Sequence, residues 1–210
     1  MENDQKHFED LSEIRSLMER SSKFISLSGI SGIIAGLIAF AGAFAAWWYL
    51  HVFVLSVEMP FFFHSLSGSE EMVIMLSLLS IVVFISALAG AIYFTTRSSR
   101  KKNIKIWDLN TKRLLFSLFL PLAAGAFFIF ALIYYGLFFL ILPSSLIFYG
   151  LSLINGSNYT YSDIKFLGYF EIILGAICLF LPFLGLYIWA FGFGVMHIIY
   201  GIVMYFKYER

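Results

Sequence analysis

Long apolar runs, nearly free of charge, alternate along the chain with short polar segments. A membrane-crossing helix needs roughly 20 mostly apolar residues, whereas strands of a membrane barrel alternate apolar and polar positions. These runs do not alternate, so they predict an all-α, polytopic membrane protein with six transmembrane helices. The predicted spans are 26–50, 72–95, 114–134, 137–155, 164–184 and 186–206.

The composition narrows the class of protein further. Of the 210 residues, 60% are hydrophobic and 13% are charged, whereas a soluble domain has about 45–50% apolar and about 25% charged residues. This composition excludes a soluble globular enzyme, and it excludes disorder, which requires low hydrophobicity and high charge. The single cysteine, Cys178, lies within an apolar run and cannot form an internal disulfide.

The polar N-terminal segment predicts a separate element. Apolar residues recur there at helical spacing, which indicates a short amphipathic helix over residues 1–23. We expect a six-helix transmembrane domain over 24–206 and a cytoplasmic tail over 207–210. The amphipathic helix either docks on a partner or the membrane surface, or packs beneath the bundle. Its polar face is not rich in Lys and Arg, which favours packing beneath the bundle.

The distribution of basic residues predicts the orientation. With six spans, all 14 Lys and Arg residues fall on one side of the membrane, and the positive-inside rule makes that side, with both termini, cytoplasmic. Seven of them lie in the predicted 97–113 loop. We interpret this basic loop as a topological signal that also contacts anionic lipid headgroups. Trp107 is its only aromatic residue, so we predict no nucleic-acid surface.

Two ionisable residues, Glu171 and His197, lie within the predicted spans five and six. Their distances from the turn near Gly185 place them at similar depth, and Glu171 lies close enough to Lys165 to be near the inner interface. Each belongs to a stripe of small residues at helical spacing, so we expect the stripes to face each other and close the hairpin. The stripes contain Gly168, Gly175 and Cys178 in span five, and Ala190, Gly194 and Gly201 in span six.

The chemistry of this pair stays open at the level of sequence. A carboxylate beside an imidazole can relay a proton, bind a cation or hold an anionic headgroup. It can equally form a hydrogen-bonded clip that fixes the hairpin, since an unpaired charge in lipid costs about 3 kcal/mol or more.

Other candidate features are weaker. Gly32 and Gly36 in span one favour close helix packing, within the bundle in preference to a homodimer. The 51–71 loop contains His and Glu residues, but their spacing fits no compact ligand pattern, so we predict no metal site, no cofactor and no catalytic residue.

Three stretches resemble a family of uncharacterised inner-membrane proteins from Bacteroidota. They are IRSLMERSSKFISLSGISGIIAG (14–36), YTYSDIKFLGYFEIILG (159–175) and WAFGFGVMHIIYGIVMYFKYER (189–210). The resemblance implies a multi-pass protein of a bacterial inner membrane and implies no particular activity.

Three classes of function follow. We favour a non-enzymatic accessory, sensor or regulatory membrane component, with a protein partner or a second copy as its partner, because no catalytic motif occurs. The second is a small transporter or channel that uses Glu171 and His197. The third is a lipid-acting enzyme using the hydroxyls of Ser144, Ser145 or Tyr149, which ranks last because the sequence pairs no base with them.

Overall fold

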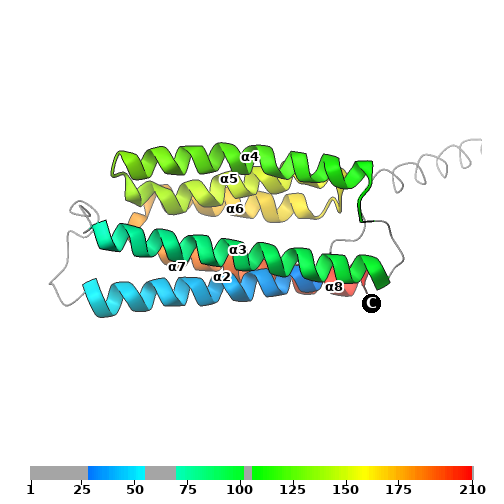
Figure 1. The fold of residues 1–210 in the computed structure, drawn as a ribbon, viewed down its shortest axis with the longest axis horizontal. Helices are drawn as coiled ribbons and strands as arrows, with labels where there is room; N and C mark the ends of the chain where they lie inside the picture. The colour runs from blue at the N-terminus through cyan, green and yellow to red at the C-terminus, as the bar shows by residue number, and fades with distance from the viewer. Residues whose placement is uncertain (1–27, 55–69, 102–105, 210) are drawn as a thin grey trace, which may run out of the picture.

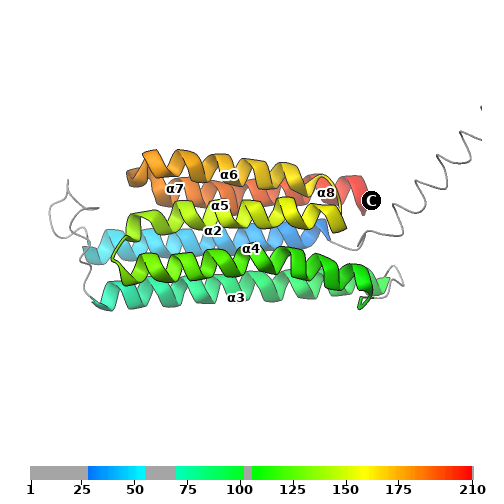
Figure 2. The ribbon, with the colours of Figure 1, turned by 90° about the horizontal axis from the view of Figure 1, so that it is seen from above.

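The computed structural model describes residues 28–54, 70–101 and 106–209, and all regular structure in these segments is helical. The predicted all-α fold is confirmed for these residues. The predicted amphipathic helix over 1–23 lies outside them, as do most of the 51–71 loop and the centre of the basic loop. Figures 1 and 2 show the long helices running side by side as one elongated bundle.

Seven α-helices and five shorter helical segments make up the described residues. The α-helices are α2 (Gly29–Tyr49), α3 (Glu70–Lys101), α4 (Leu109–Tyr134), α5 (Ile141–Gly156), α6 (Ile164–Phe180), α7 (Gly185–Trp189) and α8 (His197–Tyr208). Single turns of 3₁₀-helix form η2 (Phe138–Leu140), η3 (Ser157–Tyr159) and η4 (Pro182–Leu184). Two segments are π-helical, η1 (Leu50–Val54) and η5 (Ala190–Met196), and η5 joins α7 to α8.

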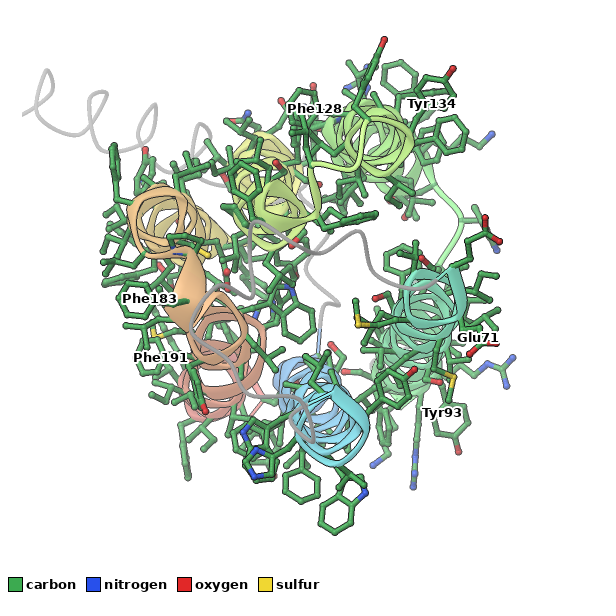
Figure 3. The ribbon with its side chains drawn as sticks, turned by 90° about the vertical axis from the view of Figure 1, so that its left-hand side faces the viewer. Glu71, Tyr93, Phe128, Tyr134, Phe183 and Phe191 are labelled. Atoms are coloured by element: carbon green, nitrogen blue, oxygen red, sulfur yellow. The ribbon has the colours of Figure 1, made fainter. Side chains whose placement is uncertain are left out.

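The described residues contain five helices that are long and apolar enough to cross a membrane. They are Gly29–Val52, Glu70–Lys101, Leu109–Tyr134, Phe138–Tyr159 and Pro182–Tyr208. Large apolar side chains cover their outer surfaces; Tyr93, Tyr134 and Phe183 point away from the bundle in Figure 3. Lipid is the solvent that suits such a surface, and helices satisfy their own backbone groups there. The fold is therefore that of a multi-pass membrane protein.

The predicted basic loop over 97–113 was wrong at both of its ends. Arg97, Arg100 and Lys101 lie in the last turns of α3, and Lys112 and Arg113 lie in the first turns of α4. Charged residues end an apolar run without ending the helix, because Lys and Arg are good helix formers and cations are favourable near a helix C-terminus.

A side-chain cap fixes the start of α4. The Asp108 carboxylate accepts hydrogen bonds from the backbone N–H and the hydroxyl of Thr111, both at 2.7 Å. These bonds to the charged form hold the pKa of Asp108 below its usual range. Helix α4 therefore has a defined first turn that carries Lys112 and Arg113.

Glycines set the closest helix crossings. A Cβ atom on Gly150 of α5 would lie 2.6 Å from the Gly168 carbonyl oxygen of α6, and a Cβ on Gly168 would lie 2.7 Å from the Gly150 carbonyl oxygen. Small residues allow such close backbone approach in lipid. Helix α2 packs in the same way on the last span, with Gly32 against Gly201. Gly32 thus packs within the bundle, the alternative that the sequence favoured.

The predicted closure of the hairpin along two facing small-residue stripes was wrong. Gly168 and Gly175 face α5, whereas Gly194 and Gly201 face α2. Helical spacing specifies that residues share a face, but it does not specify which neighbouring helix that face meets. In a bundle with several neighbours, the glycines of α6 face α5, whereas those of η5 and α8 face α2.

The first and last described helices meet at one end of the bundle (Figure 2). The Ser28 hydroxyl and the Gly29 backbone N–H both donate to the Glu209 carboxylate. An anion at a helix N-terminus satisfies free N–H groups and is favoured by the helix dipole, so Glu209 caps α2 across the length of the chain. At the same end, Lys207 and the Tyr208 hydroxyl both bond to the Asp163 carboxylate.

Candidate functional site

The candidate site is a group of polar side chains from three helices, two of them buried and one partly buried, in the middle part of the bundle. Glu171 projects from α6 and is fully buried. His197 begins α8 directly after η5 and is also buried. Tyr149 comes from α5, the helix against which α6 packs most closely. We call these three residues the Glu–His–Tyr cluster.

The imidazole of His197 links the other two side chains. Its Nε2 lies 2.7 Å from the Tyr149 hydroxyl oxygen, a hydrogen-bonding distance. Its Nδ1 lies 3.1 Å from the carbonyl oxygen of Gly192 and 3.4 Å from Glu171 Oε1. Both ring nitrogens thus have partners, and which nitrogen donates depends on the protonation state of the ring.

The π-helical segment η5 shapes the space around the carboxylate. A Cβ on Gly192 would lie 2.6 Å from Glu171 Oε2, so only glycine leaves room for the carboxylate in this position. Short π-helical stretches inside α-helices occur frequently at functional sites. Here the segment brings the Gly192 carbonyl and the His197 ring together beside Glu171.

Aromatic rings close one side of the cluster. Phe193 lies 4.8 Å from the Tyr149 ring and 5.8 Å from the His197 ring, measured between ring centroids. Trp189 packs on Phe193 at 4.8 Å and donates from its indole nitrogen to the Ser145 hydroxyl at 3.1 Å. These ring contacts hold the imidazole in one orientation.

Glu171 has few partners for a carboxylate. Within the described residues, neither of its oxygens makes a hydrogen bond, and its nearest basic partner is His197 at 3.4 Å. The Glu171–His197 pair can hold a shared proton on either residue and remain neutral overall. Loss of that proton leaves one negative charge in the bundle core, which costs about 3 kcal/mol or more.

The structure therefore brings together the two ionisable residues singled out from the sequence, while the role of the pair stays a prediction. The structure places Glu171 near the middle of α6, and its expected depth near the inner interface stays a prediction. The predicted span continued to residue 184, whereas α6 ends at Phe180, shortly before Pro182. Glu171 is therefore about as far from either end as the helix allows.

Sequence reasoning missed two members of the site. Tyr149 was considered only as a hydroxyl without a base, yet the structure supplies His197 as its partner. Gly192 lies in η5 between Ala190 and Gly194, and the predicted stripe included those two residues but not Gly192. The central position of Tyr149 in its apolar run, shared with His197, is the signal that could have found it.

The side chains of the cluster are able to exchange a proton. Hydroxyl, imidazole and carboxylate stand in the order of a catalytic triad, but burial of Glu171 and His197 keeps a substrate away. The described residues contain no group of three or more His, Cys, Asp or Glu side chains placed to hold a metal ion. Comparison with protein-family models, curated proteins and solved structures found no match for this chain, so the resemblance to a Bacteroidota family stays a prediction.

Proposed function

We propose that this chain is a non-enzymatic inner-membrane component of a bacterium, a sensor or regulatory subunit whose proton-responsive element is the Glu–His–Tyr cluster. The observation that carries the proposal is a fully buried carboxyl group, unsatisfied by hydrogen bonds among the described residues and adjacent to a single imidazole. Polar groups in membrane spans are costly and serve function by default. A protonation change here alters the contact between α6 and the last span.

The proposed topology has six spans with both termini in the cytoplasm. Helix α6, at 17 residues, is about 25 Å long and lies at the short end of the range for a spanning helix. The contact of Ser28 and Gly29 with Glu209 supports an even number of crossings. A reporter that is active only in the cytoplasm, fused after the last residue, tests the orientation; an inactive reporter, with the fusion intact in the membrane, would overturn it.

The test of the sensing role is thermal unfolding in detergent at several pH values, with native protein and the Glu171→Gln variant. Glutamine resembles a protonated glutamic acid but cannot lose a proton. At low pH we expect similar midpoints for the two proteins. As the pH rises, we expect the native midpoint to fall relative to that of the variant, because only the native cluster acquires an isolated negative charge.

Glu71→Gln is the matched control, because Glu71 is an exposed carboxylate in the first turn of α3. Its midpoint is expected to follow that of the native protein at each pH. Parallel curves for native protein and Glu171→Gln would overturn the sensing role. A Glu171→Gln midpoint well below native at every pH would instead identify the pair as a structural clip, since breaking a buried pair costs about 3–5 kcal/mol.

Proton or cation transport is the second candidate. It is favoured by the sequence of Tyr149, His197 and Glu171, three groups from three helices that can each carry a proton and lie within 3.4 Å of the next. Proton flux into liposomes distinguishes the two candidates. Flux that native protein supports and Glu171→Gln abolishes would establish transport, and equal flux for both proteins would exclude it.

A further inference from the structure

An open groove of about 420 Å³ lies between the first half of α4 and the end of α5 with η3. It is separate from the Glu–His–Tyr cluster, which occupies the middle of the bundle. One face of α4 forms most of the groove wall, because its residues recur at helical spacing. These residues are Lys112, Arg113, Phe116, Ser117 and Leu120.

The mouth of the groove is cationic. Lys112 and Arg113 lie in the first turns of α4, at the end of the helix and at the rim of the apolar surface. Both are exposed, and within the described residues neither forms an ion pair. Two cations at one site without a carboxylate partner attract an anion. At the membrane surface, an anionic lipid headgroup can supply that negative charge.

The floor of the groove contains a polar atom without a partner. The Ser117 hydroxyl is buried, and within the described residues it makes no hydrogen bond. The backbone carbonyl of Ser117 accepts from the Asn155 side-chain amide at 2.8 Å, which fixes the wall on the α5 side. Buried polar groups in proteins are nearly always hydrogen-bonded, so this hydroxyl is free to donate to an oxygen atom of a ligand in the groove.

The deeper part of the groove is apolar and open to the side. Phe116 is 68% exposed and Leu120 is 57% exposed. At about 1.5 Å per residue, Leu120 lies about 12 Å farther along α4 than Lys112. Charge at the mouth, a hydroxyl below it and an apolar wall beneath reproduce the order of groups in a phospholipid.

We propose that this groove binds one anionic phospholipid. Lys112 and Arg113 hold the headgroup phosphate, the Ser117 hydroxyl donates to a phosphate or ester oxygen, and an acyl chain lies along Phe116 and Leu120. The site is independent of the sensing role proposed for the Glu–His–Tyr cluster, and Glu171→Gln leaves lipid binding unchanged.

The test is lipid binding to the purified full chain, measured by native mass spectrometry with phosphatidylglycerol and phosphatidylcholine. We expect phosphatidylglycerol to bind more tightly, and we expect Lys112→Gln with Arg113→Gln to weaken it by about tenfold or more. Arg100→Gln with Lys101→Gln is the matched control, since it removes two exposed charges from the end of α3, outside the groove. The control should weaken binding by less than about twofold. Equal losses in the two double variants would overturn the site.

Ser117→Ala is the second variant. Removing a hydroxyl that has no partner among the described residues leaves their packing intact, so a several-fold loss of affinity for phosphatidylglycerol reports contact with the lipid. Affinity equal to native would overturn the role of the hydroxyl. Glycerol 3-phosphate distinguishes a lipid from a free phosphate: we expect it to compete only at far higher concentration. Competition at the same concentration as the lipid would replace the proposal with a free-phosphate site.

Discussion

The crossing of α5 and α6 makes a quantitative prediction for Gly168→Ala. A Cβ on Gly168 would lie 2.7 Å from the Gly150 carbonyl oxygen, whereas ordinary contact begins at 3.4 Å. The obstacle is backbone, so it cannot rotate away as a flexible side chain would. The two helices must therefore move apart by about 0.7 Å at this point.

The magnitude follows from two opposing contributions. Overpacking of a close contact costs about 1–3 kcal/mol. Replacing a mid-helix glycine by alanine raises the free energy of unfolding by roughly 0.5–1 kcal/mol, because it lowers the backbone entropy of the unfolded chain. We expect Gly168→Ala to lower the free energy of unfolding by about 1–2 kcal/mol.

Gly185→Ala is the matched control. Gly185 begins α7 in a helical conformation, and a Cβ there would first meet Leu142 at 3.4 Å, which is ordinary contact. This variant should be neutral or slightly more stable than native. Unfolding in mixed micelles, followed by circular dichroism as the denaturing detergent increases, measures both variants against the native protein.

The reasoning is refuted if Gly168→Ala is at least as stable as Gly185→Ala. The double variant Gly150→Ala with Gly168→Ala adds a second check. Its cost should be smaller than the sum of the two single costs, because one separation of the helices relieves both contacts. Additive costs would mean that the two glycines do not share one crossing.

Three further predictions concern other contacts. Gly192→Ala should lower the free energy of unfolding by about 1–3 kcal/mol, because its Cβ would lie 2.6 Å from Glu171 Oε2 and 2.9 Å from Leu146 Cδ2. Combination with Glu171→Ala should reduce this loss without removing it, and an undiminished loss would contradict the contact with Glu171. Glu209→Gln should cost about 0.5–2 kcal/mol through loss of the charge that caps α2, and a midpoint equal to native would exclude that cap. The hydrogen bond from Lys207 holds the pKa of Asp163 below its ordinary value of 3.8. The ion pair therefore stabilises the protein fully above pH 3.8, and this stabilisation is lost as the pH falls through the lower pKa of Asp163 in the folded protein. The difference in unfolding midpoint between native protein and Asp163→Asn should shrink over that pH range, and a constant difference would argue against the ion pair.

The existence of the spans could be predicted from the sequence because lipid imposes one requirement on every residue of a span. Side chains must be apolar and backbone groups must be hydrogen-bonded within the segment, so an apolar run such as 114–134 predicts a helix over those residues. The ends of the helices are harder to predict from the sequence. The basic residues Arg97 to Lys101 continue α3 past the apolar run, since the backbone can stay helical in water.

The candidate site could be predicted only in part. Glu171 and His197 stood out because charge is rare within spans, and their similar depth followed from counting along one hairpin. Tyr149 comes from a helix outside that hairpin, and helical spacing carries no information about which helix meets which. The π-helical segment η5 was also missed, because one extra residue per turn leaves the hydropathy of the run unchanged.

The pairing of α2 with α8 has a consequence for how the chain is made. The ribosome delivers α2 to the membrane before α8, so Gly29, Gly32 and Gly36 have no partner until the last described span has been made. Helices α4, α5 and α6 contact neighbours in the sequence and can assemble as they emerge. A chain released before α8 is made would therefore contain the α4–α6 unit and an α2 that packs on α3 but leaves Gly29, Gly32 and Gly36 without the last span against them.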